Sequence, residues 1–384
     1  MPSDDPIHAR AAPASAAPSD PSPATPAPPS SERAGRRVLL ADIGGTWARF
    51  ATHDLDGDDP RDLQGFRRFR CRDFPSLQAA IRTYLGARSL AQVGQVCLAL
   101  PGPVDREEIS LSNNPWRFSR PALEAELGVP LTLINDFAAQ AYASDRLVPD
   151  ELHLTGAPRP DPRGVRVVLG PGTGLGVAVR LPGGLVLPSE AGHTGFSPAS
   201  EHELDLIRVL FSRHPRISVE RLVSGPGLVN LFEANRILAG GATPPSTPGT
   251  APGARVEDAS EDAAGDALRD ALEAPDDPTA PARIAELAAQ GHPVARRAVD
   301  DFFNILASFS GDMALAVWAT GGVYISGAVV RKLAAFLDED RFRARFQAKG
   351  RFEGFCAGVA IGWMRVEEPG LLGCAARMRI GRGA

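Results

Sequence analysis

Two short apolar segments that each run into a glycine-rich turn constrain this chain more than any other feature. Arg37–Ile43 leads into Gly44-Gly45-Thr46, and Val165–Leu169 leads into Gly170-Pro171-Gly172-Thr173-Gly174. Apolar residues rather than a helix pattern follow the second turn, so a dinucleotide-binding fold is disfavoured. Glycines let the backbone fold back and expose N–H groups, which suits phosphate. Either turn alone is explained by an ordinary β-hairpin, but together they predict a polyphosphate clamp.

The rest of the ordered sequence alternates between strand and helix patterns, which predicts an α/β architecture with parallel or mixed sheets. Further strands are expected at Val93–Leu100 and Leu131–Ile134. The helix periodicity predicts helices at Pro75–Leu85, Phe137–Leu147, Leu204–Phe211, Gly227–Leu238, Ile284–Gln290 and Pro293–Trp318, the last interrupted at Gly311.

Composition bounds the domain organisation and the partners. The chain has 384 residues, enough for two or three domains, and a net charge of −5. No global positive field is available for nucleic acid or an anionic membrane. Residues 1–35 are rich in Pro and Ala and predict a disordered tail, and residues 240–277 predict a low-complexity insertion. Neither segment is expected to carry chemistry.

The four cysteines are widely spaced and form no metal-binding or disulfide pattern. The sequence has no apolar run long enough for a membrane span and no signal-peptide pattern at its start. These features predict a cytoplasmic protein in a reducing compartment.

Polar residues at two strand ends are candidates for chemistry. Asp42 stands two residues before the first glycine turn, where it could hold Mg²⁺ through water beside phosphates. Asn135 and Asp136 follow another strand, where α/β proteins form ligand crevices. From these residues alone, helix N-capping is the favoured explanation of the Asn-Asp pair, because both are preferred cap residues.

A third group of polar residues follows the second glycine turn. It comprises Glu190 and His193 of the segment Ser189–His193, with Glu220 further along the chain. Carboxylates and an imidazole that converge on one pocket suit sugar hydroxyls, which need donors and acceptors in fixed directions. Spacing alone does not decide whether these residues converge, and an isolated Glu or His is usually a surface residue.

Several motifs in register make the chain resemble bacterial glucokinases, which belong to the actin-like sugar-kinase superfamily. The resemblance covers residues 37–381 and leaves out the tail and the insertion. It rests on the segments ADIGGTWARF, LSNNPWRFS, LINDFAAQA, VLGPGTGLGVA, PSEAGHTGFSP, ERLVSGPGLVNLF, TGGVYISGAVV and PGLLG.

The resemblance implies a two-domain actin-like, ribonuclease H-like fold with an interdomain cleft. It implies a small α/β domain of residues 36–136, completed by a C-terminal helix at 371–384, and a large α/β domain of residues 137–370. The implied activity is ATP-dependent phosphorylation of the 6-hydroxyl of D-glucose, the first step of glycolysis. A homodimer is also implied.

The resemblance also assigns residues to roles. Asp136 is implied as the catalytic base, and Asp42 as the Mg²⁺ site. Glucose is implied to bind at Asn135, Asp136, Glu190, His193 and Glu220. ATP is implied to bind at Ala41, Asp42, Ile43, Gly44, Gly45, Thr46, Gly172, Thr173, Gly174, Ser326 and Gly327, the last two after a strand at Val323–Ile325.

Three residues depart from the family pattern: Trp47 after Gly-Gly-Thr, Ala191 between Glu190 and His193, and Ala328 after the adenosine loop. Trp47 either crowds the approach of sugar or phosphate or turns outward. The alternatives that stay open are a sugar-responsive regulator without turnover, a kinase for another hexose or an amino sugar, and polyphosphate as the phosphoryl donor.

Overall fold

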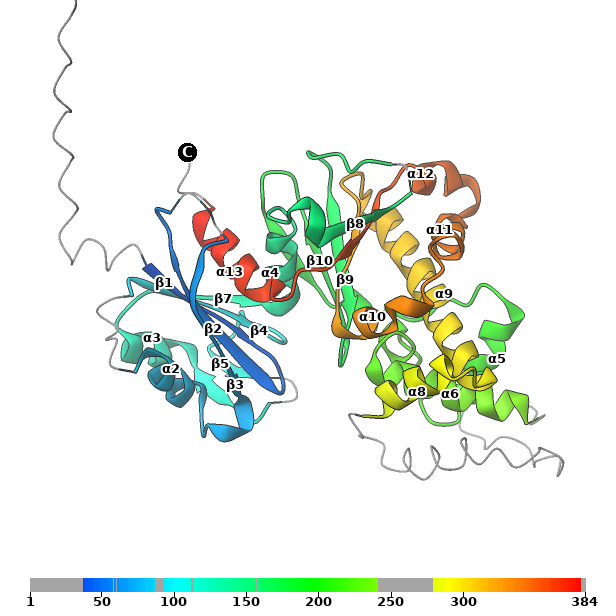
Figure 1. The fold of residues 1–384 in the computed structure, drawn as a ribbon, viewed down its shortest axis with the longest axis horizontal. Coiled ribbons are helices and arrows are strands. Elements are labelled where there is room, and N and C mark those ends of the chain that lie inside the picture. The colour runs from blue at the N-terminus through cyan, green and yellow to red at the C-terminus, as the bar shows by residue number, and fades with distance from the viewer. Residues whose placement is uncertain are drawn as a thin grey trace, which may run out of the picture.

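The structure is a computed structural model, and it describes residues 37–57, 59, 61–86, 93–111, 114–156, 158–240 and 279–380. The expected tail at 1–35 and, apart from Gly240, the expected insertion at 240–277 lie outside these ranges. Two large mixed sheets with helices against them make up the described chain (Figure 1). This is the α/β architecture that the alternating pattern predicts.

The first sheet has the strand order β3-β2-β1-β4-β7. Its strands are β1 (Arg37–Ile43), β2 (Trp47–Asp54), β3 (Leu63–Arg70), β4 (Gln95–Leu100) and β7 (Leu131–Asn135). β1, β2 and β3 are antiparallel neighbours, whereas β4 and β7 are parallel to β1. Helices α2 (Leu77–Leu85) and α3 (Arg120–Leu127) bury apolar side chains together with one face of this sheet. A two-stranded ribbon, β5 (Glu108–Ser110) and β6 (Arg117–Ser119), lies beside them.

The second sheet has the order β11-β10-β9-β12-β13-β8 and repeats the pattern of the first. Its strands are β8 (Leu152–Thr155), β9 (Arg166–Pro171), β10 (Leu175–Arg180), β11 (Val186–Ser189), β12 (Val323–Ile325) and β13 (Ile361–Met364). β9, β10 and β11 are antiparallel neighbours, while β12 and β13 are parallel to β9. In both sheets, therefore, a glycine-rich turn joins the first two strands of an antiparallel ribbon.

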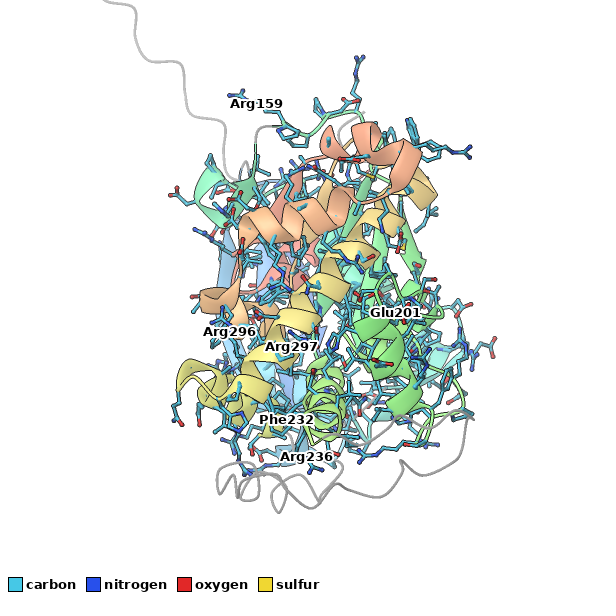
Figure 2. All side chains as sticks on the ribbon, turned by 90° about the vertical axis from the view of Figure 1, so that its right-hand side faces the viewer. Arg159, Glu201, Phe232, Arg236, Arg296 and Arg297 are labelled. Atoms are coloured by element: carbon cyan, nitrogen blue, oxygen red, sulfur yellow. The ribbon has the colours of Figure 1, made fainter. Side chains whose placement is uncertain are left out.

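A layer of helices covers one face of the second sheet and shares a single apolar core with it. These helices are α5 (Glu201–Leu210), α6 (Gly225–Ala239), α8 (Ala280–Ala289), α9 (Pro293–Val317), α10 (Ala328–Leu333), α11 (Glu339–Gln347) and α12 (Glu353–Ala357). Figure 2 views this side, where α9 crosses beside α5 and α6; Phe232 on α6 is buried, whereas Arg296 lies over the ring of Phe336.

Helix α9 continues through Gly311, which corrects the expected interruption there. The glycine is needed for packing: a Cβ at Gly311 would lie 2.3 Å from the carbonyl oxygen of Phe346 at the end of α11. Close helix packing therefore outweighs the low helix propensity of glycine.

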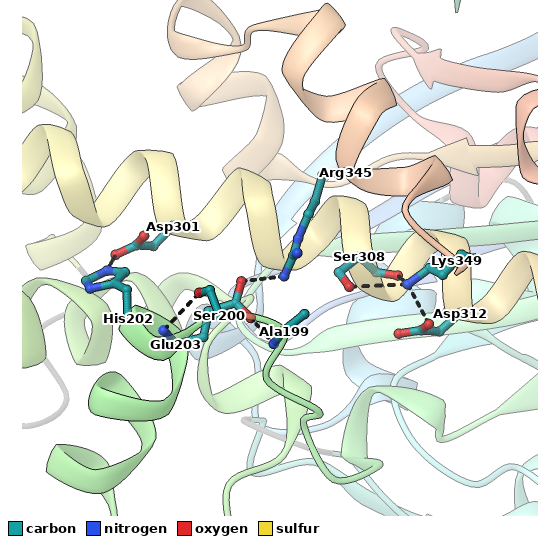
Figure 3. Close-up of polar contacts among 9 residues, drawn as sticks. All are labelled: Ala199, Ser200, His202, Glu203, Asp301, Ser308, Asp312, Arg345 and Lys349. Atoms are coloured by element: carbon teal, nitrogen blue, oxygen red, sulfur yellow. Dashed lines mark hydrogen bonds and ion pairs between the residues drawn. The ribbon is translucent and has the colours of Figure 1, made fainter. Parts of the chain in front are cut away.

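Polar contacts join α5 to α9 and α11 to α5 (Figure 3). Asp301 of α9 is buried; it accepts a hydrogen bond from Asn235 at 2.8 Å and pairs with His202 at 2.9 Å. Arg345 of α11 donates to Glu203 of α5 at 2.6 Å. Because these charged groups are largely buried, removing one partner would leave the other uncompensated.

Two helices, α4 (Asp136–Ala143) and α13 (Pro369–Arg379), lie side by side between the sheets (Figure 1). Their core includes side chains from both sheets, among them Leu40 of β1 and Val168 of β9. The helices touch backbone to backbone, since a Cβ at Gly373 would lie 1.7 Å from the carbonyl oxygen of Ala139. This crossing joins the two halves of the molecule.

The boundaries of these two helices differ from expectation. α4 ends at Ala143 rather than Leu147, and the Ser144 hydroxyl donates to the Ala141 carbonyl, which competes with helix extension. α13 starts at Pro369, a favoured first helical residue, and ends at Arg379. Residues 381–384 of the expected C-terminal helix lie outside the described residues. In the part of the chain that the structure describes, no helix meets the length and hydropathy of a membrane span.

The α4–α13 crossing makes Gly373→Ala strongly destabilising. The added methyl group has to displace backbone, so we expect a loss of about 3 kcal/mol in the free energy of unfolding. The matched control is Gly354→Ala in α12, where a Cβ meets nothing within 4 Å. It should be neutral or stabilise by up to about 1 kcal/mol. Equal effects of the two substitutions in urea denaturation would contradict this account.

Candidate active site

The carboxyl ends of β1, β4 and β7 meet at one edge of the first sheet, and this edge carries the first half of the site. β4 lies between β1 and β7 and is parallel to both. Asp42 is near the end of β1, the Gly102 turn follows β4, and Asn135 ends β7. Parallel pairing therefore brings Asp42 near Asn135 and Asp136, although they are far apart in sequence.

Asn135 is the N-cap of α4, as the capping interpretation predicts. Its Oδ1 accepts hydrogen bonds from the N–H groups of Phe137 at 3.0 Å and Ala138 at 3.1 Å. Its Nδ2 donates to the Gly102 carbonyl at 3.3 Å. The side chain of Asn135 thus holds the start of α4 in place and fixes the position of Asp136.

Asp136 is the first residue of α4 and its carboxyl group has a strongly shifted pKa. Burial raises this pKa from 3.8 to about 7, the negative charges of Asp42 and Glu190 add to the rise, and the backbone N–H of Phe137 opposes it. The Phe137 N–H donates to Oδ1 of Asp136 at 2.9 Å. A carboxyl group in this range can take up or release a proton near neutral pH.

Asp42 belongs to a cluster of acidic groups with one guanidinium. Arg49 lies 3.4 Å from Oδ2 of Asp42 and 2.6 Å from Oε2 of Glu368. Burial raises the pKa of Asp42, while the charge of Arg49 opposes this. Gly370 in the first turn of α13 packs on the Asp42 carboxylate, where a Cβ would lie 2.5 Å from Cγ. Motif reasoning missed Arg49, Glu368 and Gly370.

Hydrogen bonds from neighbouring residues hold the first glycine turn, Gly44–Thr46, in place. The Gly44 N–H donates to the Trp47 carbonyl at 2.8 Å, and the Gly44 carbonyl accepts from Asn114 Nδ2 at 3.1 Å. The Cys71 N–H donates to the Thr46 carbonyl at 2.9 Å. The side chains of Ala41 and Ile43 are buried in the core, so only their backbone can meet a ligand.

The second glycine turn, Gly172–Gly174, sits against the start of α6. The Gly225 N–H donates to the Gly172 carbonyl at 2.8 Å, and the Gly172 N–H donates to the Gly174 carbonyl at 2.7 Å. A Cβ at Gly172 would meet nothing within 4 Å, so the outer side of the turn has room for a ligand, and the side chain of Thr173 is exposed.

Ser326 and Gly327 lie directly beside the base of this turn. The Ser326 N–H donates to the Leu169 carbonyl at 2.9 Å. Gly327 has φ 108°, a conformation that favours glycine, and a Cβ there would lie 2.3 Å from the Pro171 carbonyl oxygen. Ala328, where the family pattern has glycine, is the first residue of α10.

Glu190, His193 and Glu220 lie close together. His193 Nδ1 is 3.6 Å from Oε1 of Glu220, and its Nε2 is 3.7 Å from Oε2 of Glu190. These separations exceed hydrogen-bond length, so the polar atoms remain available to other partners. Ala191 begins the 3-10 turn that presents His193, and its N–H donates to Ser189 Oγ at 3.1 Å.

Glu220 also links this group to the second glycine turn. Its Oε2 accepts from the Leu175 N–H at 2.8 Å, and a Cβ at Gly174 would lie 2.5 Å from the same oxygen. The charge of Glu190 also reaches Asp136. A series of close groups therefore runs from Asp42 to the second turn. Within the described ranges, no hydrogen bond or ion pair joins the two glycine turns directly.

The acidic cluster suits a hard divalent cation held largely by water. Arg49 pairs with the carboxyl groups of Asp42 and Glu368, and the charge of Asp42 also reaches the carboxyl group of Asp136. The part of the chain that the structure describes contains no group of three His, Cys, Asp or Glu ready to ligate a metal. A cation with few protein ligands, as Mg²⁺ prefers, fits this arrangement.

Comparison with known proteins identifies a family. The model of the glucokinase family matches residues 39–380. The glucokinase of Chromohalobacter salexigens is 36% identical over 342 residues, which cover 88% of this chain and 96% of that relative. The glucokinase of Xanthomonas oryzae pv. oryzae is 37% identical over 354 residues, covering 88% of this chain and 94% of that one.

Solved structures show the same fold. A glucokinase from an Antarctic psychrotroph is 31% identical, with a TM-score of 0.72, and the match covers 89% of this chain and 98% of that one. The glucokinase of Balamuthia mandrillaris, solved in complex with glucose, is 20% identical with a TM-score of 0.65 over 91% of this chain and 94% of that one. The actin-like sugar-kinase fold expected from the sequence is thereby confirmed.

The raised pKa of Asp136 predicts a pH-dependent gain in stability for Asp136→Asn. The folded state binds a proton on Asp136 more tightly than the unfolded state does. Protonation of Asp136 therefore stabilises the wild-type fold fully below pH 3.8, and this stabilisation is lost as the pH rises through about 7. The variant cannot ionise there, and Asn can still accept from the Phe137 N–H.

We therefore expect Asp136→Asn to gain stability over wild type by a few kcal/mol at most at pH 8, at about 1.4 kcal/mol per pKa unit. The gain should shrink toward pH 4. Urea denaturation at several pH values measures it, with Asp150→Asn, an exposed carboxylate, as the control. A difference that does not vary with pH would contradict the shifted pKa.

Proposed function

The chain belongs to the glucokinase family, and we propose that it transfers the γ-phosphoryl group of ATP to the 6-hydroxyl of D-glucose. The products are glucose 6-phosphate and ADP. The observation that carries the proposal is the placement of the half-buried Asp136 carboxyl group at the start of α4, where burial and the charges of Asp42 and Glu190 raise its pKa to about 7.

Asp136 is proposed as the catalytic base. Its carboxylate accepts the proton of the 6-hydroxyl group as the hydroxyl oxygen forms a bond to the γ-phosphorus, and the bond from that phosphorus to the ADP oxygen breaks. The N-cap at Asn135 supports this role because it fixes the backbone that carries Asp136. Positioning contributes most of the rate in such a transfer.

ATP is proposed to lie between the glycine turns. The backbone of Gly44, Gly45 and Thr46 on one side, and of Gly172–Gly174 on the other, would face its phosphates, with Ser326 and Gly327 beside the adenosine. Asp42 would hold Mg²⁺ through water. The metal, when bound, neutralises charge on the phosphates. The open space outside Gly172 supports this placement.

Glucose is proposed to bind against Glu190, His193 and Glu220, with Asn135 and Asp136 at the reacting end. The spacing of the three side chains supports this, since polar atoms 3.6–3.7 Å apart do not satisfy one another and can bind sugar hydroxyls placed beside them. A wrong epimer would leave a polar group unpaired, at a cost of about 1–3 kcal/mol.

The division of the molecule follows as a further part of the proposal. We propose a small domain of residues 36–136 completed by the C-terminal helix, and a large domain of residues 137–370, hinged at α4 and α13. The hydrogen bond from the Cys374 thiol of α13 to the Ala41 carbonyl of β1 supports this division, because it joins the C-terminal helix to the first sheet. A cytoplasmic location and a homodimer are proposed from the family alone.

A coupled assay of ADP formation tests the reaction. Glucose, mannose, fructose and N-acetylglucosamine are compared with no sugar in the presence of Mg-ATP. Glucose-selective turnover is expected. Thermal stabilisation by glucose without turnover with any sugar would instead indicate a regulator that kept the sugar site.

Asp136→Asn should lower kcat by roughly 10²–10⁴-fold and leave the affinity for glucose within about threefold. In wild type, kcat/KM should rise with pH through about 7 as the base ionises. Stopped assays across pH and glucose binding by calorimetry measure both. Asp150→Asn again serves as the control. A near-wild-type kcat in Asp136→Asn would show that Asp136 is not the base.

Glu220 should affect both substrates, because it contacts His193 and the second turn. Glu220→Ala removes both contacts, so KM should rise for glucose and for ATP, each by about tenfold. Glu220→Gln keeps an oxygen for the Leu175 N–H and should raise mainly the KM for glucose. Equal donor KM values for wild type and Glu220→Ala would show that the link to the turn has no role in binding ATP.

A further inference from the structure

Two arginines beside the first glycine turn, Arg68 and Arg70, have no part in the assignments above. β2 and β3 pair so that Trp47 is opposite Arg70 and Arg49 is opposite Arg68. Directly opposed residues share a face of the sheet, as do residues two apart on one strand. These four side chains therefore lie on one face, which we call the arginine face.

The arginine face is the one that meets the Asp42 cluster. Arg49, on this face, contacts both Asp42 and Glu368. Burial raises the pKa of Glu368, and the charge of Arg68, which is exposed one strand further out, opposes this rise together with that of Arg49. Toward the turn, Arg70 precedes Cys71, whose N–H holds the Thr46 carbonyl. The face therefore extends from the acidic cluster to the tip of the turn.

Trp47 organises this face. The guanidinium of Arg68 lies 4.3 Å from the centroid of the Trp47 ring, and that of Arg70 lies 5.2 Å from it. Cation–π contacts at these distances hold the two arginines over the indole. The departure of Trp47 from the family pattern thus has a structural consequence: the ring lies along the sheet with two guanidinium groups on it.

Neither Arg68 nor Arg70 forms an ion pair with a carboxylate within residues 37–57, 59, 61–86 or the other described ranges. Each retains several N–H donors in a planar array that suits phosphate oxygens. We propose that Arg68 and Arg70, held by Trp47, bind the phosphoanhydride chain of the phosphoryl donor next to the Gly44–Thr46 turn. This inference rests on the proposed kinase function.

The charge balance favours such a ligand. The cleft side of the first sheet otherwise presents Asp42, Asp136 and Glu368 against one arginine. A triphosphate adds further negative charge, and the guanidinium groups of Arg68 and Arg70 at its approach would offset this repulsion. The ligand chemistry is a linear chain of phosphates, which either a nucleoside triphosphate or inorganic polyphosphate supplies.

Inorganic tripolyphosphate is the direct probe because it has the chain without the nucleoside. Calorimetry should show binding to wild type, and the double variant Arg68→Gln/Arg70→Gln should bind about tenfold more weakly or worse. The matched control is Arg67→Gln, since Arg67 is opposite Phe50 on the other face and is also exposed. It should change affinity by less than about twofold.

Kinetics provide the second measurement. The double variant should raise the KM for Mg-ATP by about tenfold while the KM for glucose stays unchanged, and added KCl should raise the wild-type KM for Mg-ATP more than that of the variant. The single variants and Trp47→Leu should show smaller shifts in the same direction. Unchanged tripolyphosphate binding and Mg-ATP KM in the double variant would overturn the proposal.

Long-chain polyphosphate in place of ATP distinguishes the two sources. If polyphosphate alone supports phosphorylation of glucose, and this rate falls in the double variant, the site binds the inorganic chain as well. Turnover that requires ATP, with tripolyphosphate acting as a competitive inhibitor, assigns it to the nucleotide. If the wild-type protein binds tripolyphosphate but phosphorylates no sugar, the phosphate site is supported and the proposed kinase function is contradicted.

Discussion

The backbone contact between α4 and α13 is the constraint on which the rest of the structure depends. Gly373 leaves space for the Ala139 carbonyl, so the two helices cross closely enough to share one core with both sheets. Both helices begin at the proposed active site, α4 with Asp136 and α13 with Gly370 against Asp42. One crossing therefore sets the relative position of the two carboxylates.

Much of the fold could be predicted because its signals are local. For example, the apolar strand Leu131–Asn135 and the helix that begins at Asp136 are each indicated by the pattern of their own neighbouring residues. By contrast, the contact of Arg49 with Glu368 joins opposite ends of the chain, and no local pattern indicates it. The antiparallel register that puts Arg49 beside Asp42 depends on the length of the turn between β1 and β2, which the glycine motif alone does not determine.

Local rules also explain the errors. Glycine at position 311 predicts an interruption, but α11 packs on it and the helix continues, because tertiary contacts outweigh propensity. Asn135 fits two interpretations, cap residue and site residue. The structure shows the capping contacts directly, and they are compatible with a role in the site, since the cap is what places Asp136.

The position of Asp136 depends on the second sheet as well as on its own. Phe137, the next residue, packs over Gly176 of β10, where any Cβ would lie 1.8 Å from its ring. β10 starts directly after the second glycine turn, and its first residue, Leu175, is hydrogen bonded to Glu220. A rotation of one sheet against the other would therefore move Asp136 and the second turn together, because the Phe137 ring has no space to slide. Packing at α4 thus couples the Asp136 carboxylate to the second glycine turn and to Glu220, which is the arrangement that the proposed sugar and ATP sites require.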